Sequence, residues 1–296
     1  LWYDSSDSEF KYKYQAYGSA WSTGNSMNNA RRNLGAAGIQ TSALGFGGYD
    51  TAVRGYTESY NGTNWTEVND LNTSRSSLGG TGTQPAALAF GGYSTTATNV
   101  TETWNGSNWT EVNDLNTART ALTGTGTQPA ALAFGGQGMS ALTELWNGTN
   151  WTEVNDLNTA RRDLGANGTT TSSLAYGGDT PGSTAATESW NGTNWTDVAD
   201  LNTARRLVGA GTDNTNALGI GGETPGGVSA LTESWNGSIW TETTDLNTAR
   251  QELAATGASN SSAIAFGGTL NPPEVAFTEE WNAGINLGAW YTGGNM

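Results

Sequence analysis

The chain repeats one sixteen-residue phrase five times with few changes. Residues 146–161 read WNGTNWTEVNDLNTAR, and close copies occupy residues 60–75, 104–119, 190–205 and 235–250. A catalytic site is not written five times along one chain, whereas a structural unit often is. We therefore expect the fold to be an array of equivalent units, with recognition left to the segments in which the units differ.

A Gly-Gly pair marks the same place in each unit and gives the period of the repeat. The pairs lie at residues 47–48, 91–92, 135–136, 177–178, 221–222 and 267–268. Successive pairs are 44, 44, 42, 44 and 46 residues apart, so six units cover about residues 31–296. Helical arrays have similar periods, so the period alone does not distinguish helices from strands.

The local pattern within a unit favours strands. Apolar runs such as ALAFGG at residues 87–92 are short and end in glycine, which is typical of buried strands. Residues 57–68, TESYNGTNWTEV, contain two short strands around Asn-Gly, the strongest local signal of a hairpin. Each unit thus has four predicted strands. Strand a follows an arginine, b ends in Gly-Gly, c is Thr-Glu-x-Trp, and d starts at the second tryptophan.

Four antiparallel strands repeated around an axis form the blades of a β-propeller. We predict an all-β fold, a six-bladed β-propeller of four-stranded antiparallel blades. The alternative is seven blades with a partial N-terminal blade, although the sequence offers no strand a for the additional blade.

The repeat resembles the kelch repeat. That family places Gly-Gly at the end of its second strand, an aromatic residue on the third, a tryptophan on the fourth, and a Pro-Arg or Ala-Arg step before the next blade. In the third unit these residues are Gly135-Gly136, Trp146, Trp151 and Ala160-Arg161, and the other units carry equivalents. The resemblance spans nearly the whole chain and implies a propeller. Kelch units often approach 50 residues, so the loops here should be short.

Each unit contains one arginine before strand a and one glutamate in strand c. If strands a and b form a hairpin centred near Ile39, Arg31 lies opposite Gly48, and Glu58 lies across strand b. A guanidinium can cross strand b only where no side chain blocks it, so we predict one ion pair per blade. The pairs are Arg31 with Glu58, Arg75 with Glu102, Arg119 with Glu144, Arg161 with Glu188, Arg205 with Glu233, and Arg250 with Glu279. The alternative is an anion-binding ring of arginines, which we consider less favoured because each arginine has its own carboxylate.

Two aromatic residues bracket the turn between strands c and d in each unit. The pairs include Tyr60 with Trp65, Trp104 with Trp109, Trp146 with Trp151, Trp190 with Trp195, and Trp235 with Trp240. Large aromatic side chains dominate cores, so we expect them to pack blade against blade; the alternative is a set of platforms for stacking sugars. The Asn-Gly-Thr triplets between them match the glycosylation pattern, but we interpret them as hairpin turns.

The connection between strands b and c differs from unit to unit, whereas the d–a connection, NDLNTAR, is nearly constant. Alternating strands place the b–c and d–a loops on one face. A rigid scaffold with one variable loop face is typical of binding proteins, and the alternative is drift of unconstrained loops. The candidate ligand-binding residues on this face are Tyr49, Asp50, Arg54, Tyr93, Asp179, Glu223 and Glu274. Aromatic rings and carboxylates together suit glycans.

Both ends of the chain resemble strand d. Residues 18–27, GSAWSTGNSM, and residues 288–296, GAWYTGGNM, are similar, and only one can complete a six-bladed ring. Either Trp21 or Trp290 therefore closes the last blade. We divide the chain into residues 1–28, a hairpin or connector that includes the first candidate closing strand, and residues 29–296, the propeller. Within the connector, residues 1–14 loosely resemble connector segments of phage tail-fibre and appendage proteins.

The composition limits the chemistry that the chain can perform. Cysteine and histidine are absent, so there is no disulfide, thiolate nucleophile, or Cys or His metal ligand. The net charge of −15 argues against nucleic-acid binding, and no apolar run is long enough for a spanning helix. We expect no cofactor and no dedicated metal site, although carboxylates and carbonyls leave weak calcium binding open.

These observations favour a non-enzymatic recognition module. We expect an adhesin on a virion or cell surface, extracellular and part of a larger virion assembly, that binds a host glycan or protein receptor through the b–c loop face. Kelch-like propellers include copper sugar oxidases, but their metal site needs Cys and His. The alternatives are a glycosidase using two of Asp50, Asp179, Glu223 and Glu274, or a protein-interaction adaptor.

Overall fold

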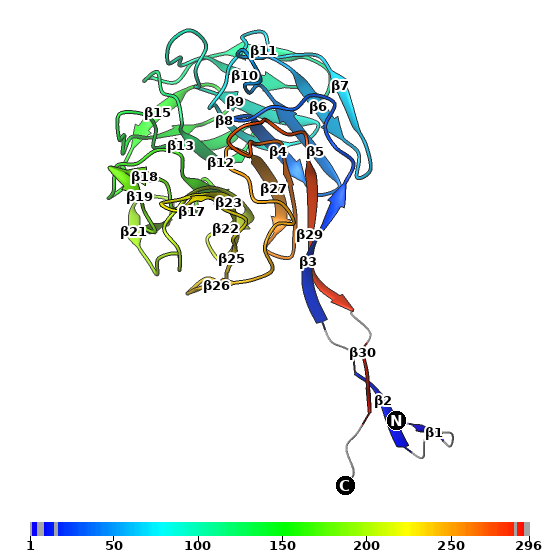
Figure 1. The fold of residues 1–296 in the computed structure, drawn as a ribbon. Helices are drawn as coiled ribbons and strands as arrows, with labels where there is room; N and C mark the ends of the chain where they lie inside the picture. Colours follow the sequence, from blue (N-terminus) through cyan, green and yellow to red (C-terminus); the bar gives the residue numbers. More distant parts are fainter. Residues whose placement is uncertain (1, 5–8, 15–16, 287–288, 293–296) are drawn as a thin grey trace.

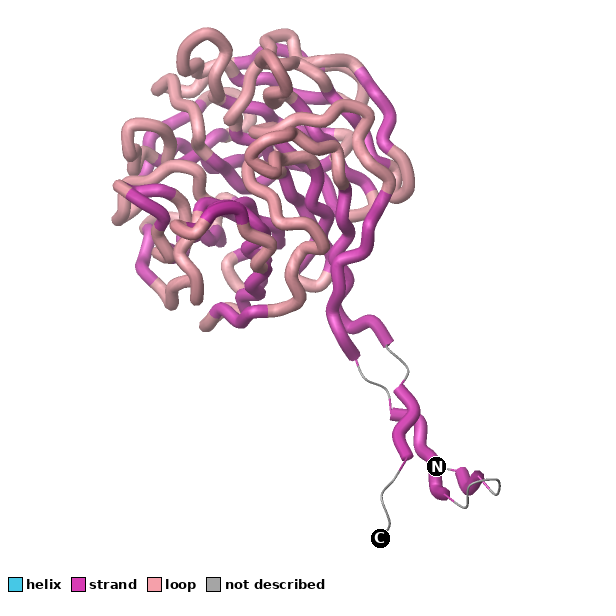
Figure 2. The backbone as a smooth tube through the Cα atoms, viewed as in Figure 1, coloured by secondary structure: helices cyan, strands magenta, loops and turns pink. Residues whose placement is uncertain are grey.

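A computed structural model describes residues 2–4, 9–14, 17–286 and 289–292, with side chains for 18–206 and 214–284. The protein is all-β: six four-stranded antiparallel sheets form the blades of a propeller around one axis (Figure 1). Strands and connecting loops make up the described part of the trace (Figure 2). Within the described residues, no helix is long and apolar enough to cross a membrane. The six-bladed prediction is confirmed, and no seventh blade occurs among these sheets.

The six blades follow one another in chain order. Blade 1 contains β4 (Gly35–Ile39), β5 (Ser42–Phe46), β6 (Thr57–Tyr60) and β7 (Trp65–Val68). Blade 2 contains β8 (Gly79–Thr83), β9 (Ala86–Phe90), β10 (Thr101–Trp104) and β11 (Trp109–Val112). Blade 3 contains β12 (Thr123–Thr127), β13 (Ala130–Phe134), β14 (Thr143–Trp146) and β15 (Trp151–Val154).

In the next two blades, short additional strands lie at or within the b–c loop. Blade 4 contains β16 (Gly165–Thr169), β17 (Ser172–Tyr176), β20 (Thr187–Trp190) and β21 (Trp195–Asp197), with β18 (Asp179–Thr180) and β19 (Gly182–Ser183) in its b–c loop. Blade 5 contains β22 (Arg206–Asp213), β23 (Asn216–Thr224), β25 (Thr232–Trp235) and β26 (Trp240–Glu242), with β24 (Gly227–Val228) beside β23. Blade 6 contains β27 (Ala254–Ser259), β28 (Ser262–Phe266), β29 (Thr278–Asn286) and β3 (Tyr17–Gly24).

The Asn-Gly dipeptides form the predicted c–d hairpin turns. In blade 1 the turn brings Tyr60 opposite Trp65. Gly62 has φ 88°, a conformation that glycine adopts without steric cost. The Oδ1 atom of Asn61 accepts hydrogen bonds from the backbone N–H groups of Thr63 and Asn64, at 3.0 and 2.8 Å. The exposed asparagine therefore serves the turn itself.

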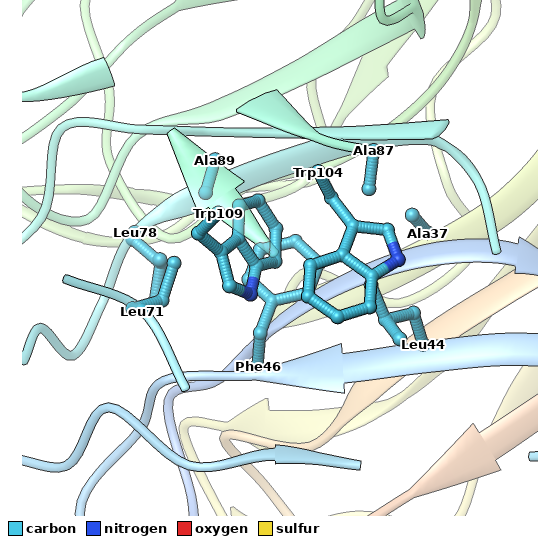
Figure 3. Close-up of a cluster of buried hydrophobic side chains, with 9 residues drawn as sticks. All are labelled: Ala37, Leu44, Phe46, Leu71, Leu78, Ala87, Ala89, Trp104 and Trp109. Carbon is cyan, nitrogen blue, oxygen red and sulfur yellow. The ribbon is translucent and has the colours of Figure 1, made fainter. Parts of the chain in front are cut away.

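The aromatic pairs fill the space between neighbouring blades. Figure 3 shows this for blades 1 and 2, where Trp104 and Trp109 lie against side chains of the preceding blade. The rings of Trp109 and Phe46 meet edge to face, with their centroids 4.9 Å apart. The Nε1 atom of Trp109 donates to Thr57 Oγ1 at 3.0 Å. Trp104 and Trp109 are 2% and 5% exposed, so they pack blade against blade and offer no sugar platform.

The two ends of the chain close the ring together. The outermost strand of blade 6 is β3, which pairs with β29 so that Trp21 lies opposite Trp281. Trp21, rather than Trp290, therefore completes the last blade. Trp290 lies in β30 (Ala289–Thr292), which pairs with β2 (Glu9–Tyr14); β2 in turn forms an antiparallel hairpin with β1 (Trp2–Asp4). We call this sheet the stalk, and it projects from the propeller in Figures 1 and 2. Of the second candidate closing segment, 288–296, the structure describes residues 289–292.

Candidate functional site

All six predicted Arg–Glu pairs are present as buried ion pairs. The Nη2 atoms of three arginines lie 2.9, 2.8 and 3.1 Å from a glutamate oxygen; these pairs are Arg75 with Glu102, Arg119 with Glu144, and Arg161 with Glu188. In the other three pairs an Nη1 atom bonds the carboxylate; these are Arg31 with Glu58, Arg205 with Glu233, and Arg250 with Glu279. All twelve side chains are at most 3% exposed, so the arginines are not arranged around an open pore.

Each glutamate also fastens the loop by which the chain enters its blade. In blade 2, Asn72 donates both its backbone N–H and its side-chain N–H to Glu102 Oε2, each at 2.8 Å. In the other five blades the equivalent asparagine also donates its backbone N–H to the glutamate, at 2.7 Å in each case; the acceptors are Glu58, Glu144, Glu188, Glu233 and Glu279. The asparagine thus donates to one carboxylate oxygen, while the other oxygen bonds the arginine and, in blade 2, also accepts from the N–H of Thr73 at 3.3 Å. This arrangement explains why LNTAR is almost constant.

The Gly-Gly pair has a role that the sequence analysis missed. We expected bare backbone so that the arginine could cross strand b, and a Cβ on Gly48 would lie 3.3 Å from Arg31 Cδ. In addition, the Gly48 N–H donates to the backbone carbonyl of Arg75 in the next blade at 2.8 Å. A Cβ on Gly47 would lie 2.5 Å from that carbonyl oxygen. The first glycine therefore permits close contact between blades.

The predicted ligand-binding residues lie on one face, but most are held by internal contacts. Asp50 bonds Arg54 within its own loop, at 2.8 Å. Partial burial would raise the pKa of Asp50, but hydrogen bonds from Arg54 and two backbone amides outweigh it and lower that pKa to about 2. The Tyr49 ring lies 5.2 Å from the guanidinium carbon of Arg32. Tyr93 is 42% exposed.

The other three predicted carboxylates form ion pairs with arginines that the sequence analysis did not single out. Asp179 lies 2.7 Å from Arg162, Glu223 lies 2.5 Å from Arg206, and Glu274 lies 3.2 Å from Arg32. The signal was visible as an Arg-Arg dipeptide in units 1, 4 and 5. The equivalent second positions in the other units are Ser76, Thr120 and Gln251.

A cavity of about 600 Å³ lies along the axis, lined mainly by the innermost strands. Its mouth on the b–c loop side includes the second residue after five of the blade arginines. These five residues form a chain of backbone hydrogen bonds: Asn33 N–H donates to Glu252 O, and Ser77 N–H donates to Asn33 O, both at 2.8 Å. Ala121 and Asp163 extend the chain at 2.9 and 3.0 Å. These five mouth residues have φ between 50° and 57°.

Asp163 is the carboxylate of the mouth with the weakest pairing. Its closest cation is Arg162 Nε at 3.6 Å, and that arginine also bonds Asp179. Burial in the mouth raises the pKa of Asp163 to about 6. Arg162 and Arg206 oppose the rise in pKa, whereas the charges of Glu252 and Asp179 add to it.

Replacing Asp163 by asparagine should stabilise the protein above pH 6. Because the carboxyl pKa is raised from 3.8, the folded state binds more protons than the unfolded state, and the group's contribution to stability falls as pH rises through this window. With 36% of the side chain exposed, screening limits the gain to about 1 kcal/mol, or about 2–4 °C in Tm. Thermal unfolding should show the gain above pH 6 and its loss below pH 3.8. An equal gain at both pH values would contradict the assignment.

In comparisons with known proteins, no family model and no curated protein matches this chain. The fold itself defines the class: a six-bladed β-propeller built from repeated four-stranded blades. The blades are cross-linked internally by buried ion pairs, and the differences between them gather around one mouth of the axial cavity.

Proposed function

We propose that the protein is a kelch-like, non-enzymatic recognition module that binds a glycan or protein receptor through its b–c loop face. The observation that carries the proposal is the contrast between constant and variable parts. The residues of the phrase that the units share form the core packing, the buried ion pairs and the hairpin turns. The variable loops converge on one face of the scaffold.

The loops of this face are held in place before any partner arrives. Arg54 holds Asp50, and Arg162 holds Asp179. Binding by ordered loops loses less conformational entropy, which favours recognition over random drift. The face also exposes two large apolar side chains, Tyr93 at 42% and Phe277 at 40%.

The direction of the stalk supports a role at a surface. Strand β29 starts at Thr278 on the b–c loop side and ends at Asn286 on the opposite side, where it pairs with Tyr17 of β3. Both chain ends therefore leave the ring away from the loop face. An attachment through the stalk would present the loops outward, as an extracellular adhesin on a virion or cell would require, with the stalk joined to a larger assembly.

A glycan array followed by mass spectrometry tests the proposal. Replacing Tyr93 and Phe277 together by alanine should lower binding at least about tenfold, since anchors of this kind dominate interfaces. The matched control replaces Ile39 and Ile239, which are 42% and 54% exposed on the opposite face. The control should bind like the parent protein.

The outcomes separate the candidate functions. Specific binding without product release, lost only in the loop-face variant, supports a glycan adhesin. Capture of a protein receptor by cross-linking, with the same variant dependence and no glycan binding, supports a protein receptor. Release of cleaved sugar, or binding that only the opposite-face variant loses, would contradict the proposal.

A further inference from the structure

The charges around the axial mouth do not balance. Three arginines lie there, in blades 1, 4 and 5, together with five carboxylates. The arginines are Arg32, Arg162 and Arg206, and the carboxylates are Asp163, Asp179, Glu223, Glu252 and Glu274. Three positive and five negative charges leave an excess of two negative charges at the entrance to the cavity.

Of the five carboxylates, Asp163 is the one without a close arginine. Arg162 and Arg206 are committed to Asp179 and Glu223, at 2.7 and 2.5 Å. Arg32 Nη1 and Asn33 Nδ2 both donate to Glu252 Oε2, at 2.6 and 3.0 Å, and Arg32 Nε lies 3.2 Å from Glu274, so among the described residues the second oxygen of Glu252 stays open. No arginine remains for Asp163 at hydrogen-bonding distance. Both Asp163 and Glu252 line the cavity, and the charge of Glu252 contributes to the raised pKa of Asp163.

An unpartnered acceptor also belongs to the lining of the cavity. Gln251 also lines the cavity, and it is only 7% exposed. Its Oε1 atom has no hydrogen-bond partner. A buried carbonyl without a donor is costly, and such atoms are rare in folded proteins. The last side-chain torsion of glutamine is soft, so this oxygen can turn toward a donor in the mouth at little cost.

We propose that the axial mouth binds a primary ammonium group through Asp163, Glu252 and Gln251. An ammonium is a compact cation with three donors and no acceptor, which matches two carboxylates and one carbonyl. An anion would be repelled by the excess negative charge. Among the described residues, no cluster of three carboxylates is arranged to hold a metal ion. The site goes beyond receptor recognition by the loops and does not depend on it.

Two sources could supply this group, and they place the attached carbon chain differently. A free aliphatic amine would lay its chain in the cavity, where Ala36, Ala166 and Ala255 are partly exposed. The tip of a lysine side chain on a receptor would keep its stem outside the mouth. Affinity for free amines should therefore rise with chain length only in the first case, because each buried methylene contributes about 0.8 kcal/mol.

The test is a ligand-observed NMR titration of the full chain with n-pentylammonium, n-pentanol and Nα-acetyl-lysine methylamide. The titration is run above pH 6, in about 0.15 M salt to screen nonspecific attraction to the acidic surface. We expect saturable binding of the two ammonium compounds and none of the alcohol. If an alkylammonium longer than n-pentylammonium binds more tightly than n-pentylammonium, the ligand is a free amine. If the lysine derivative binds more tightly than the alkylammonium compounds, the ligand is a receptor lysine.

The variants decide whether the mouth is the site. Asp163→Asn with Glu252→Gln should weaken ammonium binding about tenfold or more, as expected for losing charge-assisted hydrogen bonds. The matched control, Glu111→Gln with Glu153→Gln, removes the same charge from exposed positions on β11 and β15 and should change affinity less than about twofold. Asp163→Asn alone retains the left-handed backbone, which asparagine tolerates. Equal losses in both double variants, or equal binding of n-pentanol, would overturn the proposal, whereas failure of the loop-face variants to affect receptor binding would not.

Discussion

Replacement of Arg161 by alanine is expected to lower the free energy of unfolding by about 3–5 kcal/mol, because it leaves one partner of a buried ion pair without its counter-charge. Both Arg161 and Glu188 are fully buried. Burial already raises the pKa of Glu188, and Arg161 is the strongest influence that lowers it. Without the guanidinium, the carboxylate would retain only backbone donors, the N–H groups of Asn158 and Thr159 at 2.7 and 3.2 Å.

The next residue supplies the matched control for this experiment. Arg162 is also an arginine in an ion pair, but about a third of its side chain is exposed and its partner is Asp179 on the loop face. Its replacement by alanine should cost about 1 kcal/mol or less. Thermal and denaturant unfolding of the two variants would give the comparison. Similar losses for both, or an unchanged Tm for the Arg161 variant, would show that the buried pair does not stabilise the blade.

The sequence was sufficient to predict the fold and the ion pairs, because repetition turns weak local signals into six concordant ones. The predicted partners were correct, although the predicted register was not: Ile39 pairs with Ser42 and Arg32 pairs with Tyr49, so the hairpin is centred one residue later and Arg31 does not lie opposite Gly48. Glu58 does lie across strand b, opposite Gly45, and the recurring Thr-Glu motif identified the later partners Glu144, Glu233 and Glu279. The aromatic packing was predictable for the same reason. A single unit would have indicated strands, but not the number of blades.

The functional features were harder to predict because they depend on contacts between units. The mouth ring arises when residues 33, 77, 121, 163 and 252 meet around the axis in a left-handed conformation, which no local motif specifies. The sequence showed the carboxylates Asp179 and Glu223 but not that Arg162 and Arg206 neutralise them. Asp163 escaped notice because it stands just after the shared phrase, which ends at Arg161, and before the variable b–c loop that follows Gly178.

Ring closure was left open for a related physical reason. Trp21 and Trp290 stand in similar local sequences, and either could form an outer strand. The choice depends on which strand pairs with β29, and that pairing joins residues more than 250 positions apart. The structure gives this place to β3 and leaves β30 in the stalk.

Replacement of Trp21 by alanine should therefore destabilise the propeller by about 3–5 kcal/mol, as expected for truncating a buried tryptophan. Trp21 is 5% exposed, and its ring centroid lies 5.4 Å from that of Trp281. Its Nε1 atom donates to Thr232 Oγ1 of blade 5 at 3.2 Å. The loss falls on the one blade that is completed by a strand from the other end of the chain. Opening of this blade would expose β29. In the Trp21→Ala variant, the backbone amides of β29 should therefore exchange hydrogen faster than those of β14, the equivalent strand of blade 3.

Trp290→Ala is the control that distinguishes the two ways of closing the ring. Strand β30 pairs with β2 outside the six blades, so this variant should leave the Tm of the propeller and the hydrogen exchange of β29 unchanged. Measuring Tm and the hydrogen exchange of β29 in both variants shows which strand closes the ring. If Trp290→Ala lowered the Tm by roughly 10 °C and Trp21→Ala did not, β30 would have to be the closing strand, since a loss of that size requires a buried tryptophan.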